Sequence, residues 1–311
     1  MQLHLFGAAT ASGEAFRQLA ASRHQGWQVA AYSREPADHL HRLQNVHSAD
    51  FSNPAAFRPA GVGGGPAIWI SFGPIWLLAP FLEQLATHHP ERLSGLNGLI
   101  ACSSSSALTK RFAANRFDRE LAARLTGAED QLLSTCRRLQ VTCRILRPTL
   151  IYGQVGPYGD HNLSRILQLM RRLPLLPLPA DTGLRQPIHA LQLASVALAL
   201  AGQLARSGED GVSSEPTALP ERIDLGGDKS LSYTAMIKAL QMALPPGDPA
   251  RHCLLLLIPN RLFFALAAPL LLRSPKAFEA VLRMGADLAG FTPSHQLLGQ
   301  PAKPFPVLPL A

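Results

Sequence analysis

The sequence predicts an α/β protein with a Rossmann-type, doubly wound parallel sheet and a small C-terminal substrate-binding α/β subdomain. Short apolar runs alternate with helical stretches through the first half of the chain, a pattern typical of parallel sheets. The first apolar run ends at Gly7, and Gly13 follows where a helical stretch begins, which predicts a tight strand-to-helix turn. The 311 residues are 47% hydrophobic, enough to bury one large core or two smaller ones.

Five strands are expected before residue 153, and each is an apolar run bounded by turn residues or polar residues. They cover residues 2–6, 27–32, 66–73, 96–106 and 141–148, and the fourth ends in a run of serines. Helices are expected at residues 13–22, 76–88 and 117–138, and a turn into a short helix follows Asp50. Ligands bind at the carboxyl ends of the strands in such sheets, so the residues at these ends are candidate site residues.

The pattern changes after residue 153. We therefore expect a Rossmann domain over residues 1–153 and a mainly substrate-binding subdomain over residues 154–311, some of whose elements return to the first sheet. Helices are expected at residues 161–173, 190–206 and 232–244, with a proline-rich turn at residues 173–183 and a strand at residues 221–227. Ser232 is the expected N-cap of the last of these helices.

Residues 253–272 (CLLLLIPNRLFFALAAPLLL) are strongly apolar, but Pro259, Asn260 and Arg261 interrupt them. The eleven residues that remain are too few to span a bilayer, which takes about 20. One interpretation is a core or partner-facing helix of the second domain. The other is a contact with a membrane surface or with another protein subunit.

The formal net charge is +8, yet the basic residues are scattered and form no block interleaved with aromatic residues. This distribution argues against a nucleic-acid partner and favours phosphate-bearing ligands or solubility. The four cysteines form no CxxC pair, so neither a disulfide framework nor a metal site is expected. No charged leader precedes an apolar core, and we expect a cytoplasmic, reduced protein.

The first turn has the spacing of a dinucleotide-binding loop, in which Gly7 permits the turn and Gly13 allows close helix packing. Thr10 stands where such loops usually carry a glycine. After the second strand, Ser33 and Arg34 occupy the place of the acid that grips the ribose of NAD, which suits a 2′-phosphate and favours NADP(H) over NAD(H). Asp50 is placed to meet the adenine amino group. The full set of expected cofactor-binding residues is Gly7, Thr10, Ala11, Ser12, Gly13, Ser33, Arg34, Asp50, Phe51, Ser71, Phe72, Gly73, Arg147 and Pro148.

Further motifs follow in a characteristic order along the chain. They are GAATASG (7–13), Ser33-Arg34-Glu35-Pro36, ADFSN (49–53), the serines at 103–106, ILRPTLIYG (145–153), TGLRQPIHALQLA (182–194), IDLGG (223–227), LSYTAMIKAL (231–240), MGADLAGF (284–291) and PAKPF (301–305). In these motifs the chain resembles, over nearly its whole length, the extended and atypical short-chain dehydrogenase/reductases, the group of the NAD-dependent epimerases and dehydratases. The resemblance implies an NAD(P)-dependent oxidoreductase, epimerase or dehydratase.

The catalytic pair of that family, a tyrosine followed four residues later by a lysine, is missing. No YxxxK occurs in the chain, and the pair would fall near Leu121 and Leu125. If hydride chemistry persists, the candidate substitutes are Ser105 or Ser106, Tyr152 and Lys110. Two alternatives remain open, namely a catalytically silent NADPH-binding scaffold or assembly protein, and the binding of a nucleotide sugar or other anion without redox chemistry.

The resemblance also bears on the substrate. Arg185 matches the arginine that nucleotide-sugar epimerases place on the substrate diphosphate, a task that suits a bidentate guanidinium. A solvated surface arginine is the alternative. His189 matches a family histidine and is expected to be structural. Gln192 replaces the family's aspartate, a departure that affects the local hydrogen-bond network.

Overall fold

The computed structural model describes residues 1–23, 26–34, 46–61, 65–113, 115–160, 162–209, 219–274, 279 and 281–308. Its centre is an eight-stranded sheet in the order β14-β11-β6-β5-β4-β1-β2-β3, in which all neighbouring strands are parallel. The strands are β1 (Gln2–Phe6), β2 (Gln28–Ser33), β3 (Val46–Ser48), β4 (Ala67–Ser71), β5 (Leu96–Cys102), β6 (Thr142–Pro148), β11 (Arg222–Gly226) and β14 (Thr292–Pro293). The strand order reverses at β1, which pairs with β2 and β4, and ligands bind at such a switch point. The predicted Rossmann-type sheet is confirmed.

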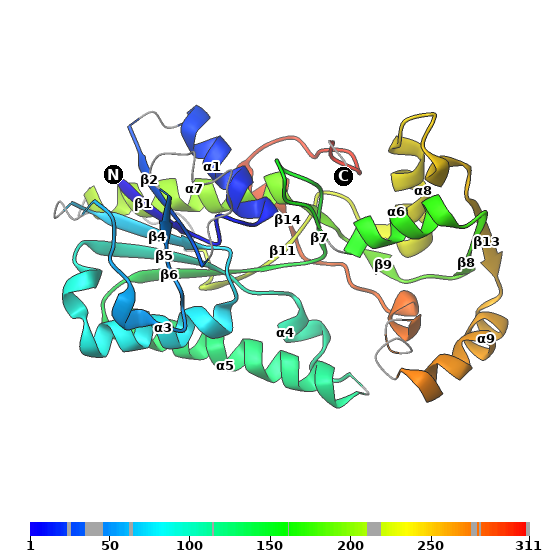
Figure 1. Cartoon of the computed structure of the whole chain (residues 1–311), viewed down its shortest axis with the longest axis horizontal. Helices are drawn as coiled ribbons and strands as arrows, with labels where there is room; N and C mark the ends of the chain where they lie inside the picture. The colour runs from blue at the N-terminus through cyan, green and yellow to red at the C-terminus, as the bar shows by residue number, and fades with distance from the viewer. Residues whose placement is uncertain are drawn as a thin grey trace.

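Helices cover both faces of this sheet (Figure 1). Helices α1 (Ala11–Arg23) and α7 (Ala190–Glu209) pack on one face, where Phe16 and Leu193 are fully buried. Helices α3 (Ile75–His88) and α5 (Arg116–Arg138) pack on the other face, over a core that includes Leu78 and Leu132. Two apolar layers therefore hold the strand ends in fixed positions.

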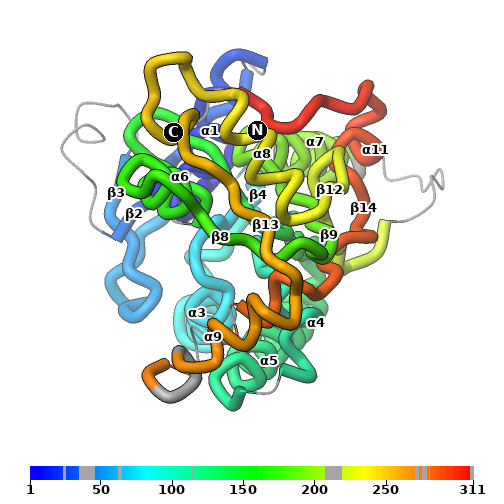
Figure 2. Tube along the Cα trace, turned by 90° about the vertical axis from the view of Figure 1, so that its right-hand side faces the viewer, coloured from blue at the N-terminus to red at the C-terminus, as the bar shows by residue number. Residues whose placement is uncertain are grey.

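A second, smaller unit lies at one end of the molecule, the end that faces the viewer in Figure 2. It contains α6 (Asn162–Arg172), α8 (Tyr233–Ala243) and α9 (Asn260–Arg273), together with a two-stranded parallel sheet of β8 (Leu175–Pro179) and β13 (Leu254–Ile258). Leu167 and Met236 are buried in its core. After residue 153 the chain returns to the main sheet at α7, β11 and β14.

Shorter elements connect these units. They are η1 (Pro54–Ala56), η2 (Pro90–Leu93), α4 (Ser106–Thr109), β7 (Ile151–Tyr152), β9 (Leu184–Arg185), β10 (Ile188–His189), β12 (Leu231–Ser232), η3 (Pro249–His252), η4 (Arg283–Gly285) and α11 (Ser294–Leu298). The Ser232 hydroxyl accepts a hydrogen bond from the amide of Ala235 (3.1 Å), as predicted for the N-cap of α8.

Three sequence-based expectations require correction. The fourth strand ends at Cys102, because the Ser104 hydroxyl accepts a hydrogen bond from the Ser106 amide (3.1 Å) and turns the chain into α4. The proline-rich turn at residues 173–183 contains strand β8, since prolines are tolerated in a strand that has an open edge. The apolar segment 253–272 is not one helix, because Pro259 separates strand β13 from helix α9.

Candidate functional site

The turn between β1 and α1 has room only for glycine at two positions. Gly7 has a φ of +76°, and a Cβ there would lie 2.8 Å from the Gly73 amide nitrogen. A Cβ on Gly13 would lie 2.2 Å from the carbonyl oxygen of Gly7. This close packing brings the N-terminus of α1 to the carboxyl end of β1, where its dipole and its first amides can meet a phosphate. The turn therefore fits the pyrophosphate of a dinucleotide.

Thr10 closes this turn with its side chain. Its hydroxyl donates to the carbonyl of Gly7 (2.8 Å) and accepts from the amide of Gly13 (3.0 Å). Thr10 thus caps α1, and the amides of Ala11 and Ser12 remain as the first-turn donors that a helix cannot satisfy itself. The departure from glycine at this position leaves the turn intact.

The next strand ends lie beside this turn, since β2 pairs with β1 and β3 with β2. Ser33 is buried at the end of β2, and Arg34 is exposed directly after it. Asp50 follows β3 and accepts a hydrogen bond from the Ser52 amide (2.9 Å). The pKa of the Asp50 carboxyl lies below its usual value, through the Ser52 hydrogen bonds first and also through the charge of Arg34. Arg34 and Asp50 therefore share one edge, while Glu35 and Pro36 lie outside the described residues.

The end of β4 completes this edge of the sheet. Ser71 is buried and its hydroxyl accepts a hydrogen bond from the Gly73 amide (3.3 Å). Phe72 lies against Phe16 of α1, with ring centroids 6.1 Å apart. The ring of Phe51 packs against Phe81 of α3, with 4.9 Å between the ring centroids. Phe51, a predicted cofactor contact, therefore also contributes to the core.

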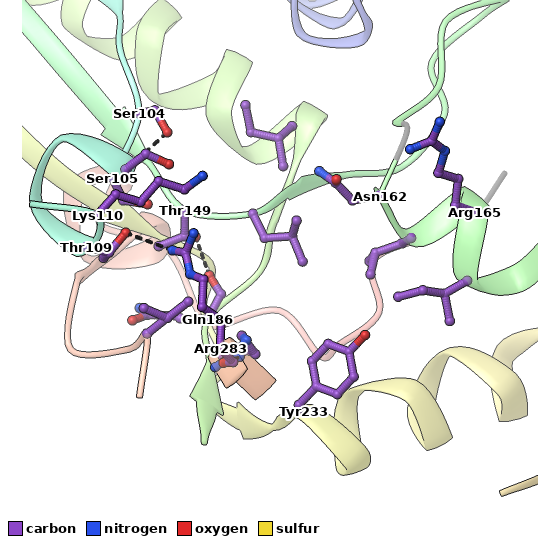
Figure 3. Close-up of a pocket in the computed structure, with 17 residues that line it drawn as sticks. Ser104, Ser105, Thr109, Lys110, Thr149, Asn162, Arg165, Gln186, Tyr233 and Arg283 are labelled. Atoms are coloured by element: carbon purple, nitrogen blue, oxygen red, sulfur yellow. Dashed lines mark hydrogen bonds between the residues drawn. The ribbon is translucent and has the colours of Figure 1, made fainter. Parts of the chain in front are cut away.

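A cavity of about 580 Å³ opens on the other side of the switch point, between the main sheet and the second unit (Figure 3). The main-sheet side contributes the segments after β5 and β6, and the second unit contributes α6, β9, the start of α8 and η4. None of the described residues that line the cavity is acidic. The lining consists of Ser104, Ser105, Ser106, Thr109, Lys110, Thr149, Leu150, Ile151, Asn162, Leu163, Arg165, Ile166, Arg185, Gln186, Tyr233, Arg283 and Leu288.

Two lining cations, Lys110 and Arg283, pair with one carboxylate that does not itself line the cavity. Asp118, in the first turn of α5, lies 2.5 Å from Lys110 Nζ and 3.8 Å from Arg283. Burial alone would raise the pKa of the Asp118 carboxyl, but hydrogen bonds from Lys110 and Asn115 hold it below its usual value. Asp118 therefore stays ionised and fixes both cations beside the cavity.

Arg185 is buried, which corrects the alternative of a solvated surface arginine. Its guanidinium donates to the carbonyls of Leu184 (2.8 Å), Ala286 (2.5 Å) and Arg283, and it lies 5.5 Å from the ring centroid of Tyr233. Burial lowers the pKa of Arg185. Burial also raises the pKa of Tyr233, although the charge of Arg185 acts against this shift. Arg185 therefore lines the cavity and also ties β9 to the segment at residues 283–286.

Ser105 and Lys110 line the cavity together, but Tyr152 does not. The Tyr152 side chain is buried in the core of the second unit, and its hydroxyl accepts a hydrogen bond from the Val307 amide (2.8 Å). Burial raises the pKa of Tyr152, which disfavours loss of its proton. The interpretation of Tyr152 as a catalytic group is therefore withdrawn. On α5, Leu125 is buried in the core between α5 and the main sheet, and Leu121 packs against this core.

Arg147 also differs from its sequence-based role. It lies in β6 just before Pro148, but its guanidinium binds the fully buried carboxylate of Glu129 (Nε to both oxygens 3.0 Å). Burial alone would lower the pKa of Arg147, whereas the hydrogen bonds and charge of Glu129 raise it. Arg147 therefore forms a buried, structural ion pair with Glu129 and is not a candidate cofactor ligand. Pro148 is likewise buried, and its carbonyl accepts from the Ser105 amide (2.9 Å).

Gln192 preserves a local network at the start of α7. Its Oε1 accepts a hydrogen bond from the His189 amide (3.0 Å), and its Nε2 donates to the Ser294 hydroxyl (3.1 Å). His189 is fully buried, and its Nδ1 accepts from the Leu191 amide (3.1 Å). Both residues hold the backbone in place, in agreement with the structural role expected for His189.

Sequence reasoning missed Tyr233, Arg165 and Arg283 as lining residues. Figure 3 shows Tyr233 rising from α8 across the cavity from Ser105 and Lys110. Tyr233 is the first residue of α8, directly after the N-cap Ser232. The predicted N-cap therefore marked Tyr233 as a residue at the start of this helix. Arg165 comes from α6 and Arg283 from η4, and no local sequence pattern marks either of them as a cavity residue. Within the described ranges, no cluster of three metal-ligating side chains occurs.

No protein-family profile matches the chain, and no curated protein matches its sequence. Solved structures do match its fold. The UDP-glucose 4-epimerase of Bifidobacterium longum, solved with NAD⁺ and UDP, has a TM-score of 0.60 at 14% identity, over 97% of this chain and 94% of that one. Gre2 of Candida albicans, solved with NADPH, has a TM-score of 0.60 at 11% identity, over 98% and 95%. The UDP-glucuronic acid 4-epimerase of Bacillus cereus, solved with NAD, has a TM-score of 0.56 at 15% identity, over 92% and 95%. The chain is thus similar in fold to NAD- and NADPH-binding proteins over almost its whole length.

Proposed function

We propose that this chain, which has the fold of the NAD-dependent epimerases and of Gre2, is an NADP(H)-binding, epimerase/dehydratase-like oxidoreductase for a phosphate-bearing substrate. The observation that carries the proposal is the cavity at the carboxyl ends of β5 and β6, whose described polar lining consists of hydroxyls, amides and cations, without an acid. A nucleotide sugar is the kind of substrate that such a lining suits, because it combines a diphosphate with polar hydroxyls. The carboxyl ends of β5 and β6 lie at the same edge of the parallel sheet as the carboxyl end of β1, where the glycine turn begins.

The cofactor would lie along the edge formed by β4, β1, β2 and β3. The first amides of α1 would hold its pyrophosphate, and Ser33 and Arg34 would meet the adenine ribose and its 2′-phosphate. Asp50 would face the adenine. When bound, the cofactor supplies hydride transfer.

Within the cavity, the arginines would bind the substrate phosphates and the hydroxyl of Ser105 would hydrogen-bond the reacting oxygen. Lys110 would supply positive charge beside that oxygen, held in place by Asp118 (2.5 Å). Tyr233 enters from the opposite side and adds a phenolic hydroxyl to the serine and threonine hydroxyls of the same cavity. This arrangement differs from a YxxxK pair, because Ser105 and Lys110 flank the short α4 and Tyr233 comes from α8.

Replacing Arg34 by alanine is expected to weaken NADPH binding by about tenfold to a hundredfold, the loss typical of a hydrogen bond to a charged group. NADH binding should change little, since NADH has no 2′-phosphate. Titration calorimetry with both nucleotides measures the difference. Arg23→Ala, an exposed arginine at the end of α1, is the matched control. An equal loss for NADPH and NADH would refute the assignment to the 2′-phosphate.

The Ser105→Ala and Lys110→Met variants are each expected to reduce kcat by about a hundredfold, within the range of a positioned acid–base group, and to leave NADPH binding unchanged. The assay follows the loss of NADPH absorbance on oxidation, with a panel of carbonyl compounds and nucleotide sugars. Lys238→Met, an exposed residue of α8 outside the cavity, is the control. Unchanged turnover in both cavity variants would show that Ser105 and Lys110 take no part in the reaction.

One observation favours a second candidate, a catalytically silent NADPH-binding scaffold. The positions where a YxxxK pair would fall carry Leu121 and Leu125, and both contribute to the core. Tight NADPH binding without turnover on any compound of the panel is the result expected of the scaffold. Turnover that depends on Ser105 excludes it.

A further inference from the structure

The two-stranded sheet of the second unit is apolar on both faces. The register pairs Leu255 with Leu176, and these side chains contribute to the core beneath α6 and α8. The neighbouring pair of Leu254 and Leu175 points the other way, since side chains alternate along a strand. Leu254 is 62% exposed and Leu175 is 43% exposed. The outward face of this sheet is therefore aliphatic and uncovered within the described residues.

Helix α9 continues this uncovered surface. Leu262, Ala265, Leu266 and Pro269 are all exposed and stand at spacings of three and four residues, so they form one stripe along the helix. Leu262 and Leu266 are 53% and 63% exposed. A surface helix ordinarily turns such a stripe inward and presents its polar face to water. Helix α9 instead presents this stripe to water, although Phe263, Phe264 and Ala267 on the same helix are partly or fully buried.

Sheet and helix lie on the same end of the molecule. β8, β13 and α9 form its extremity in Figure 1 and face the viewer in Figure 2. We call this surface the leucine face and define it by Leu175, Leu254, Leu256, Leu262 and Leu266. Contiguous apolar surface of this kind marks an interaction site.

Basic residues predominate in the segments that carry the leucine face. Residues 162–181 and 229–274 contain eight lysines and arginines and two acids, Asp248 and Asp181, and the Asp181 amide donates to Asn260 at the start of α9 (2.9 Å). Asp248 is already paired with Arg171 (2.9 Å). Arg261 and Arg273 stand at the two ends of α9, next to the exposed leucines. A partner surface that complements this region must be apolar beneath a negatively charged layer.

We propose that the leucine face binds the surface of a membrane that contains anionic lipids. The exposed leucines enter the boundary between headgroups and acyl chains, and the arginines meet lipid phosphates. The binding is peripheral, because no helix among the described residues has the length and apolar character needed to cross a bilayer. The leucine face is separate from the cavity, and its proposed role holds whether or not the chain is an enzyme.

Flotation of the full-length protein with vesicles tests the proposal. One set of vesicles contains phosphatidylcholine alone, and the other contains phosphatidylcholine with phosphatidylglycerol. The protein is expected to float with the anionic vesicles, and high salt should weaken this binding because it screens the arginines. The double variant Leu262→Gln/Leu266→Gln should reduce the bound fraction by about tenfold or more, since it removes two inserted side chains.

Phe112→Ser is the matched control, because Phe112 is an 89% exposed apolar side chain that lies between α4 and α5, outside the leucine face. It should float like the unmodified protein. Thermal unfolding and NADPH titration of all variants verify that the fold is kept. Absence of flotation with both kinds of vesicle overturns the proposal. It is also overturned if sedimentation shows a dimer that the Leu262→Gln/Leu266→Gln variant dissociates, because the leucine face would then join two copies of the chain.

Discussion

The Glu129→Gln variant is expected to lose about 3–5 kcal/mol of unfolding free energy, the range seen when one partner of a buried ion pair is removed. Glu129 is fully buried in α5 and accepts hydrogen bonds from Arg147 (3.0 Å), Arg222 (3.2 Å) and Ser103 (2.5 Å). Glutamine keeps the shape but removes the charge, so the buried Arg147 keeps only the partly exposed Asp224 (3.4 Å) as a counter-charge. Urea denaturation measures the change.

The neighbouring residue offers the control. Asp130 also pairs with Arg222, but its side chain is 65% exposed. Asp130→Asn should therefore change the unfolding free energy by less than about 1 kcal/mol. Similar losses in the two variants would contradict the role assigned to the buried carboxylate.

The Gly13→Ala variant is expected to weaken NADPH binding by about tenfold to a hundredfold, comparable to the loss of charge-assisted hydrogen bonds to the pyrophosphate. The added Cβ would stand 2.2 Å from the Gly7 carbonyl oxygen, which is backbone and cannot rotate away. Helix α1 must shift from β1, and its first amides move with it. Calorimetric titration with NADPH measures the loss.

Gly127→Ala provides the comparison, because a Cβ at this exposed position of α5 meets no atom within 4 Å. This substitution should stabilise the helix by about 0.5–1 kcal/mol and leave NADPH binding unchanged. If Gly13→Ala binds NADPH as tightly as Gly127→Ala, the α1 turn is not the pyrophosphate site.

Most of the main sheet could be predicted because its signals are local. Each strand from β1 to β6 except the short β3 is a compact apolar run, and the long α5 carries its apolar residues at helical spacing. The second unit was harder to predict. Pro177 and Pro179 lie within β8, and only the pairing with β13, about 80 residues later, shows that this segment is a strand. Local preference is overridden there by a distant partner.

The candidate site shows the same division. The residues at the ends of β1, β2, β3 and β4 come together as expected, because parallel strands end at one edge. Arg147 lies near the end of β6 and Tyr152 lies in β7 just after it, yet both side chains are buried. No local pattern predicts that Arg147 pairs with Glu129 or that the Tyr152 hydroxyl bonds to the Val307 amide. Arg283 joins the cavity from 173 residues beyond Lys110, through their shared carboxylate Asp118. Such convergence needs the tertiary structure.

We propose that the turn at Gly7 and Gly13 holds NADP(H), and equilibrium titration of the unmodified protein with NADPH and NADH is the measurement that decides it. We expect one NADPH bound per chain, with a Kd for NADPH lower than that for NADH because of Arg34. Failure to bind either dinucleotide would contradict the claim.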